Sequence, residues 1–210
     1  VQVGPMKGGI VIFAAGNEEC DYRSYPACYE RVLSVSALAP DYRKSYYSNF
    51  SEWIDVAAPG GSYKYEGRYG DEYAVYSTLP GNAYGYMQGT SMACPHVSGV
   101  AALGLAYAAQ NGKKYTPSEF KALLLSSVYG IDDYFTGSKR GDGVIVPDLS
   151  VYKNKMGGGC IDALKLLLAI KGTPAVYVKT GEAVTVDFSR YFGGDKSVVT
   201  LESTCLLYTS

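Results

Sequence analysis

The sequence predicts an α/β fold, in which a parallel sheet packs against helices and is followed by the start of a β-sandwich-like segment. Three observations support this prediction. Short apolar runs in the first third of the chain end at residues that stop strands. A long apolar stretch after Gly89 has the length of a buried helix. Alternation of apolar and polar residues begins only after Pro174, which indicates a different kind of sheet.

Three strands are expected in the first third of the chain. They cover residues 11–15 (VIFAA), 31–38 (RVLSVSAL) and 54–58 (IDVAA). Each run is short and mostly apolar, which is typical of a strand buried on both faces of a parallel sheet. Glycine, asparagine or proline follows the first and third runs, and these residues end strands.

The next stretch is predicted to be irregular and then to form a hairpin. Residues 61–76 are rich in tyrosine, glycine and charged residues, so we expect a surface loop there. Residues 74–79 and 84–88 flank a Pro-Gly-Asn turn, which predicts two antiparallel strands.

Three helices are expected in the remainder of the ordered pattern. Residues 91 to about 110 are apolar on most sides, and a helix of that kind is buried. A Thr-Pro-Ser-Glu capping box at residues 116–119 begins a second helix, which runs to about residue 127. Residues 161–170 form the third helix and end at a Lys-Gly pair. Residues 129–159 carry many glycines, aspartates and tyrosines and are predicted to be loops.

The pattern changes after residue 173. Residues 176–179 and 183–188 alternate in polarity and predict strands of a separate β-rich accessory domain. The last six residues, 205–210 (CLLYTS), fit no earlier pattern and resemble translated sequencing-adapter read-through, so they are a candidate non-native tail. We therefore divide the chain into a first domain at 1–172, the start of a second at 173–204, and this tail.

The composition of the chain limits the classes of function and partner that it can have. The chain has 210 residues, is 47% hydrophobic and carries a net charge of −1, which suits one sizeable globular core. Nucleic acid is not an expected partner, because such partners need clustered basic residues. No membrane span is expected, because no apolar run reaches about 18 residues. The first residue is Val1, and no signal peptide is present, which suggests a fragment or a processed chain.

The five cysteines leave at least one thiol unpaired. Cys20 and Cys28 flank a short loop, and they either form a disulfide in an oxidising compartment or stay unpaired. Cys94 lies in the long apolar helix, where it is most simply a small buried hydrophobe. No Cys-x-x-Cys pair occurs, so a zinc site is not expected.

Ser91 is the candidate nucleophile. It follows Gly89, which allows a sharp turn of the backbone, and it begins the long apolar helix. Unpaired N–H groups and the positive end of the helix dipole favour a developing negative charge at this place. A serine at a helix start is ordinarily only an N-cap, so the surrounding residues have to decide between the two roles.

Residues 89–99 (GTSMACPHVSG) resemble, position by position, the nucleophile segment of the subtilisin-like serine proteases, the subtilase family. Other segments follow in the order of that family: 14–17 (AAGN), 25–27 (YPA), 47–51 (YSNFS), 55–60 (DVAAPG), 77–82 (STLPGN) and 158–163 (GGCIDA). The resemblance covers residues 1 to about 172, the C-terminal two thirds of a catalytic domain. It implies an incomplete subtilisin-like three-layer fold, with a parallel sheet between helices.

The resemblance also implies roles for individual residues. Ser91 would attack the scissile carbonyl, while the side-chain amide of Asn17 and the Ser91 N–H would bind the oxyanion. The substrate-binding residues that it implies are Ala15, Gly16, Ser24, Gly89 and Thr90. Because Gly16 and Ser24 are small, the primary specificity pocket is expected to accept a large apolar side chain.

The catalytic base is the departure from the family. In subtilases the triad Asp and His both precede the oxyanion asparagine, and neither of those segments occurs here. His96 is the only histidine, and it lies about 140° around the helix from Ser91, so it cannot serve as the base. Asp55 and Asp162 fall in structural segments of the resemblance. Residues 1–210 alone are therefore expected to be inert and poorly soluble.

The resulting hypothesis is a secreted or cell-surface serine endopeptidase that cleaves polypeptides through an acyl-enzyme on Ser91. The alternative is a non-catalytic subtilase-like binding or structural module. No cofactor or metal is expected, although Asp132, Asp133 and Asp142 could help to hold calcium without any recognised ligand spacing. Asn49 begins an Asn-Phe-Ser sequon, which is a glycosylation site only in a host that glycosylates.

Overall fold

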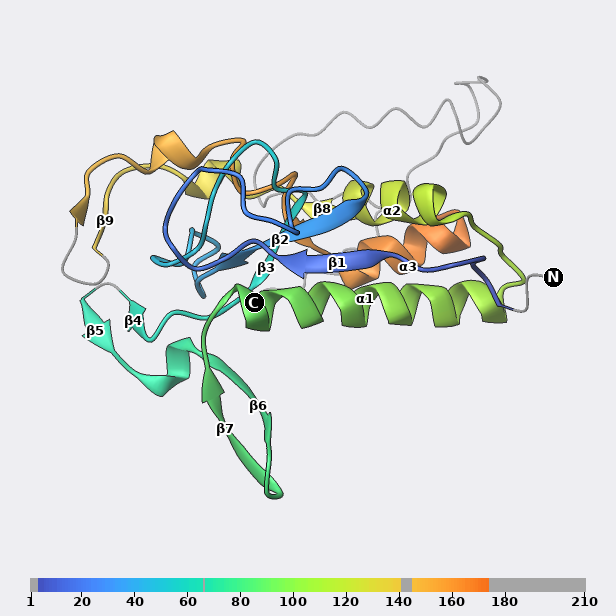
Figure 1. The fold of residues 1–210 in the computed structure, drawn as a ribbon, viewed down its shortest axis with the longest axis horizontal. Coiled ribbons are helices and arrows are strands. Elements are labelled where there is room, and N and C mark those ends of the chain that lie inside the picture. Colours follow the sequence, from blue (N-terminus) through green and yellow to red (C-terminus); the bar gives the residue numbers. More distant parts are fainter. Residues whose placement is uncertain (1–3, 66, 141–144, 174–210) are drawn as a thin grey trace, which may run out of the picture. The chain divides into compact units, whose positions relative to one another are not determined.

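A five-stranded sheet forms the centre of the fold (Figure 1). The computed structural model describes residues 4–65, 67–140 and 145–173. The strand order is β1-β2-β3-β11-β8, in which the first four strands are parallel and β8 is antiparallel to β11. The strands are β1 (Val11–Ala14), β2 (Val32–Leu38), β3 (Val56–Pro59), β11 (Cys160–Ile161) and β8 (Val128–Tyr129). The predicted α/β fold with a mainly parallel sheet is confirmed.

Strand β2 is buried along its whole length, as its apolar run predicts. Leu33, Val35 and Ala37 belong to the core beneath the helices, whereas Leu38 belongs to a second core on the other side. The two serines of β2 are also buried and are satisfied by hydrogen bonds. Ser34 donates to the carbonyl of Trp53 at 3.0 Å, and Ser36 donates to that of Met156 at 2.9 Å.

Three helices pack around the first core: α1 (Thr90–Gln110), α2 (Pro117–Ser126) and α3 (Ala163–Lys171). The capping box of α2 is confirmed, because the Glu119 N–H donates to the Thr116 hydroxyl and the Thr116 N–H donates to the Glu119 carboxylate. Helix α3 ends at Gly172, which has a φ of +83°. Gly104 lets α1 approach the other helices, since an added Cβ would lie 2.6 Å from Leu166 Cδ2.

Helix α1 differs from the prediction of a helix buried on most sides. It packs against β1, β2, β3 and α3 along one stripe of buried residues: Thr90, Ala93, Val97, Ala101, Gly104 and Ala108. Its opposite face is exposed, and Leu103 there has 48% of its surface accessible. The helix therefore has apolar residues on two faces, and other described residues pack against only one of them. By length and composition alone α1 could also span a membrane, but the sheet and α3 contact it here.

The segment predicted to be a loop at 61–76 contains a small hairpin, β4 (Lys64–Tyr65) and β5 (Arg68–Tyr69), and a 3-10 turn, η1 (Asp71–Tyr73). The hairpin predicted after it is confirmed as β6 (Val75–Leu79) and β7 (Ala83–Met87), and it projects from the rest of the fold (Figure 1). In each hairpin, the two antiparallel strands that pair are neighbours in the sequence.

The loops predicted at 129–159 hold more regular structure than expected. They contain η2 (Asp132–Tyr134), the antiparallel pair β9 (Lys139–Arg140) and β10 (Ile145–Val146), and η3 (Leu149–Tyr152). Their apolar side chains build the second core. It contains the fully buried residues Ile131, Phe135, Leu149 and Met156. Strands β8 and β11 went unpredicted because each has only two residues.

The predicted strands at 176–179 and 183–188 and the predicted tail at 205–210 lie outside the described residues.

The described cysteines of the first domain are unpaired. Cys20 and Cys28 are free thiols, so the structure agrees with the second of the two alternatives, in which they form no disulfide. Cys94 is half-buried, and burial raises the pKa of its thiol.

Candidate active site

Ser91 lies at the exposed N-terminus of α1, two residues after the sharp turn at Gly89. Gly89 has a φ of +147°, a backbone conformation that favours glycine, and its N–H donates to the Gly60 carbonyl at 3.0 Å. This turn leaves the Ser91 N–H at the open end of the helix. Among the described residues nothing accepts a hydrogen bond from that N–H.

Asn17 lies just beyond the end of β1, and Thr90 fixes the orientation of its side chain. The Asn17 Oδ1 accepts hydrogen bonds from the Thr90 N–H at 2.8 Å and from the Thr90 hydroxyl at 3.0 Å. Because the oxygen end is held in this way, the Nδ2 end points elsewhere. In the described part of the chain it donates no hydrogen bond to protein.

The Ser91 N–H and the Asn17 Nδ2 converge beside Gly89. A Cβ added to Gly89 would lie 3.6 Å from the Ser91 nitrogen and 3.8 Å from Asn17 Nδ2. Two hydrogen-bond donors therefore surround one small space, and the absent side chain of Gly89 keeps that space open. This is the arrangement that an oxyanion requires.

The residues expected to bind substrate occupy different environments. Ala15 and Thr90 are fully buried, and the Thr90 hydroxyl also accepts a hydrogen bond from the Gly16 N–H at 3.2 Å. Gly89 is buried at the turn, whereas Gly16 and Ser24 are half-buried. Thr90 thus contacts Asn17 and Gly16, and the contact with substrate that the resemblance implies stays a prediction.

Asn49 is a residue of the site that the sequence interpretation did not identify. It is completely buried, and its carboxamide hydrogen-bonds only to the segment Ala15–Cys20, which contains Asn17. The sequon interpretation does not suit this environment, because a glycan cannot be attached to a buried and fully bonded amide. The signal in the sequence was its place in the family-ordered segment 47–51.

His96 is exposed on α1, and its Nδ1 lies 2.8 Å from the carbonyl oxygen of Met92. It makes no hydrogen bond to Ser91. Among the residues that the structure describes, no side chain is hydrogen-bonded to the Ser91 hydroxyl. The described residues therefore bring together Ser91 and two N–H donors, and none of them supplies a base hydrogen-bonded to Ser91.

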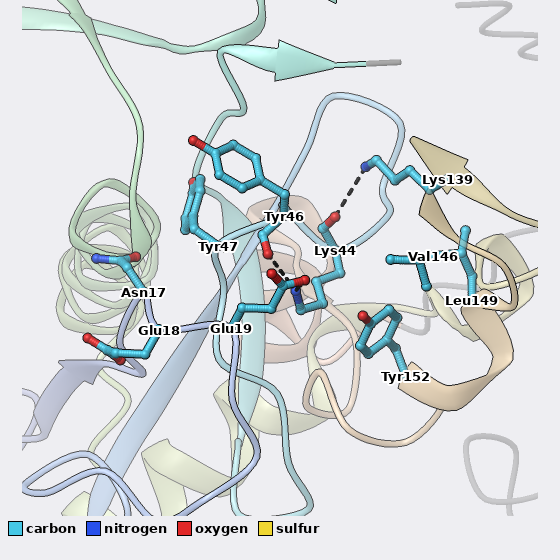
Figure 2. A pocket seen from close by; sticks show the side chains of 10 residues that line it. All are labelled: Asn17, Glu18, Glu19, Lys44, Tyr46, Tyr47, Lys139, Val146, Leu149 and Tyr152. Atoms are coloured by element: carbon cyan, nitrogen blue, oxygen red, sulfur yellow. Dashed lines mark hydrogen bonds and ion pairs between the residues drawn. The ribbon is translucent and has the colours of Figure 1, made fainter. Parts of the chain in front are cut away.

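A cavity of about 300 Å³ opens beside Asn17 (Figure 2). Asn17 lies at one edge, and the buried Lys44 lies in the middle near Glu19 and Tyr152. Lys44 Nζ donates to the Tyr46 carbonyl at 2.9 Å and lies 3.5 Å from Glu19 Oε1. Burial lowers the pKa of Lys44 to about 8, although the Glu19 carboxylate opposes this shift.

The structure also bears on metal binding. No group of three or more His, Cys, Asp or Glu side chains is placed to hold an ion among the described residues. Asp132 accepts a hydrogen bond from the Asn154 N–H at 3.2 Å, and Asp142 lies outside the described residues. Calcium binding through these aspartates stays a prediction.

Comparison with known proteins places this geometry in a family. The sequence matches the Subtilase family over residues 3–157. It is 40% identical over 119 residues to the extracellular basic protease of Dichelobacter nodosus, and this match covers 56% of the chain and 19% of that relative. It is 37% identical over 131 residues to the major intracellular serine protease of Bacillus subtilis (strain 168), covering 60% of the chain and 37% of that relative.

The fold agrees with these sequence matches. A solved protease structure from Pseudoalteromonas arctica PAMC 21717 superposes with a TM-score of 0.60 and 31% sequence identity, and the match covers 78% of the chain and 43% of that protein. The chain thus spans less than half the length of each of these three proteins. On its sequence match and its fold, the chain belongs to the subtilase family.

Proposed function

We propose that this chain is the nucleophile-bearing part of a serine endopeptidase, which hydrolyses peptide bonds through an acyl-enzyme on Ser91. The observation that carries the proposal is the convergence of the Ser91 N–H and Asn17 Nδ2 on the space beside Gly89. A binding module has no need of two unpaired donors beside an exposed serine, whereas acyl transfer does.

The chemistry follows from these groups. A base removes the Ser91 Oγ proton as the oxygen forms a bond to the substrate carbonyl carbon, and the carbonyl oxygen becomes an oxyanion. The Ser91 N–H and Asn17 Nδ2 donate hydrogen bonds to that oxyanion. Collapse of the intermediate breaks the peptide C–N bond, and the protonated base returns the proton to the leaving amine. Water then hydrolyses the ester by the same route.

The base is proposed to be a histidine, oriented by an aspartate, in a part of the polypeptide outside residues 1–210. His96 is unsuited to this role because its ring bonds the Met92 carbonyl of its own helix. Without that histidine and aspartate, residues 1–210 are expected to have no protease activity. The alternative is a non-catalytic subtilase-like module. It applies only if the complete protein contains no such histidine and aspartate.

The test has two parts. The source DNA upstream of the Val1 codon is sequenced, and the complete product is then treated with a fluorophosphonate probe. An open frame that encodes Asp-[Ser/Thr]-Gly and His-Gly segments, with labelling at Ser91 that is lost in Ser91→Ala, supports the proposal. A start codon at Val1, or a complete product that does not label, overturns it in favour of the binding module.

Polypeptide substrates, a domain boundary near residue 172 and a location outside the cell are parts of the same proposal. The relatives named above include both an extracellular and an intracellular protease. Fractionation of the source organism, followed by immunodetection of the chain, tests the location. Cleavage of a peptide library tests the open apolar pocket that the small residues Gly16 and Ser24 favour, and a preference for charged side chains would contradict it.

A further inference from the structure

We infer that Asn49 is a positioning residue that sets the placement of the oxyanion donor Asn17. This inference rests on the proposed function, because it assigns Asn49 a role through Asn17. Asn49 touches neither Ser91 nor the space where the oxyanion would form. Its effect on catalysis would be transmitted entirely by the backbone of the segment Ala15–Cys20.

The hydrogen bonds of Asn49 lie on both sides of Asn17. Before Asn17, Asn49 Nδ2 donates to the Ala15 carbonyl at 2.9 Å, and the Asn49 N–H donates to the Gly16 carbonyl at 3.0 Å. After Asn17, Asn49 Oδ1 accepts from the Glu18 N–H at 3.0 Å and from the Cys20 N–H at 3.2 Å. One buried side chain and its own backbone N–H thus hold both ends of the turn that carries Asn17.

The chemistry of the site calls for a carboxamide at Asn49. The amide has two N–H donors and a carbonyl acceptor, and all of them are used here. Nδ2 donates its second hydrogen to Glu18 Oε2 at 2.7 Å, while Oδ1 also lies 3.2 Å from the Cys20 thiol, which donates to it. An aspartate of the same size would keep the acceptor but would turn an oxygen toward the Ala15 carbonyl and the Glu18 carboxylate.

Glu19 makes two further contacts that hold the segment around Asn17: its N–H donates to the Tyr47 carbonyl at 3.0 Å, and its carboxylate lies 3.5 Å from Lys44 Nζ. Asn17, Glu18 and Glu19 are all exposed, so no apolar packing holds them. Among the described residues, the side chain of Asn17 hydrogen-bonds only to Thr90, which orients the amide at its tip. Thr90 therefore sets the rotation of the Asn17 amide, and Asn49 sets where the Asn17 backbone lies.

Asn49 is itself anchored to the sheet. The neighbouring Ser48 hydroxyl accepts a hydrogen bond from the Ala37 N–H of β2 at 2.9 Å, and the Phe50 N–H donates to the Cys20 carbonyl at 3.0 Å. Close approach to the turn also requires Gly16, because a Cβ there would overlap Asn49 Nδ2. Strand β2 thus holds Asn49 in place through Ser48, and Asn49 holds the segment Ala15–Cys20.

A double-mutant cycle tests the inference in the complete gene product. The variants are Asn49→Asp, Asn17→Ala and the double variant. Displacement of a catalytic group by about 1 Å can cost about 10²-fold in rate, so we expect Asn49→Asp to lower kcat by about 10- to 100-fold with KM within about three-fold. In the Asn17→Ala background the same substitution should lower kcat by less than about two-fold, because its target is gone.

Ser36→Ala is the matched control, because Ser36 is equally buried, but its hydroxyl donates to the Met156 carbonyl and not to Asn49 or the turn. It is expected to lower the melting temperature and to leave kcat within about two-fold of the wild type. If the losses from Asn49→Asp and Asn17→Ala multiply in the double variant, Asn49 acts independently of Asn17 and the inference is wrong.

A second readout does not depend on activity, so failure of the inference can be told from failure of the proposed function. The side-chain amide resonances of Asn17, assigned by their loss in Asn17→Ala, are expected to shift or broaden in Asn49→Asp and to stay in place in Ser36→Ala. Unchanged Asn17 resonances in Asn49→Asp overturn the inference. An inactive, unlabelled wild type overturns the proposed function alone.

Discussion

Two exposed segments of this protein are ordered in opposite ways. The turn at residues 16–20, which carries Asn17, has no regular structure and is fixed by hydrogen bonds from Asn49 and Thr90, which are distant in the sequence. The hairpin β6–β7 is fixed by its own antiparallel pairing and by the contacts of Tyr76 with Tyr84 and Tyr86. The turn depends on a few buried polar groups, whereas the hairpin depends on many small local contacts.

The difference shows how a functional turn can be exposed and yet be held in one place. A loop with no apolar side chains to bury gains order only if its backbone polar groups find partners. Concentrating those partners in one buried carboxamide makes the turn rigid and also sensitive to a single substitution. The hairpin spreads its stability over several cross-strand pairs, so it should tolerate change.

The largest effect is expected at Asn17 itself. Asn17→Asp replaces the Nδ2 donor with a carboxylate oxygen, which would repel an oxyanion and could not donate to it. Removal of the oxyanion-hole asparagine of subtilisin costs about 10²–10³ in kcat, and we expect at least that loss here. Steady-state kinetics of the complete product measures it, with exposed Glu19→Gln as the control. A loss below about ten-fold would contradict the role of Asn17.

The next effect concerns Lys44, which pairs with Glu19 of the turn. Its folded pKa of about 8 lies below the ordinary value of 10.5, so between these pH values the unfolded chain binds more protons. Stability therefore rises as the pH increases through this window, by about 2–3 kcal/mol between pH 7 and 10. Urea unfolding at each pH should show that the rise is lost in Lys44→Met.

Lys114→Met provides the control for this pH dependence, because Lys114 is exposed. Tyrosines also titrate near pH 10, so the wild type and the two variants are compared at the same pH values. An equal pH slope in Lys44→Met and in the wild type would show that the buried amine is not the group responsible.

Gly16→Ala should break the turn through its backbone. Gly16 has a φ of +106°, and its added Cβ would also overlap the Asn49 amide. Residues held in such backbone conformations cost about 1–3 kcal/mol, and the overlap adds to that. Gly81→Ala in the hairpin turn is the matched control, since its φ is +78° with no atom within 4 Å. Denaturant unfolding should therefore show a larger loss of unfolding free energy for Gly16→Ala than for Gly81→Ala. Equal losses would show that overlap with the Asn49 amide does not contribute.

The smallest effect is expected in the hairpin. Tyr84 is 63% exposed and contacts the ring of Tyr76, with centroids 5.9 Å apart. Tyr84→Ser removes one cross-strand contact, so we expect a loss of about 0.2–1 kcal/mol in unfolding free energy. Phe120→Ala, which empties a fully buried site, should cost about 3–5 kcal/mol and serves as the upper reference. A loss above about 2 kcal/mol for Tyr84→Ser would mean that the hairpin is held by more than local pairing.

Most elements of the fold could be predicted from residue patterns. The apolar run of β2, the turn residues of the hairpin and the capping box of α2 each carry a local signal, and each element is present. Strands β8 and β11 were missed because two residues cannot show a periodicity. The exposed face of α1 was also not predicted, because a mostly apolar helix sequence does not indicate which of its faces other residues will cover.

The candidate site divides in the same way. Ser91 and Asn17 were proposed because residues 89–99 and 14–17 resemble segments of the subtilase family, and the structure places the Ser91 nitrogen and Asn17 Nδ2 beside Gly89. Asn49 was not, since a lone asparagine before Phe-Ser has the same sequence whether it is a surface sequon or a buried clamp. The Thr90 hydroxyl bonds to Asn17 and Gly16, which the sequence did not indicate, and its contact with substrate stays a prediction.

The sequence by itself therefore determined the α/β class, the order of the main elements and the resemblance to the subtilase family. The first two depend on contacts between residues that are close in the chain or on the period of apolar side chains. Only the tertiary structure decided that Asn17 and Ser91 share one space, and that Asn49 and Thr90 hold Asn17 there. Those contacts join residues 29 to 74 positions apart, and no local pattern encodes which buried polar group meets which distant backbone.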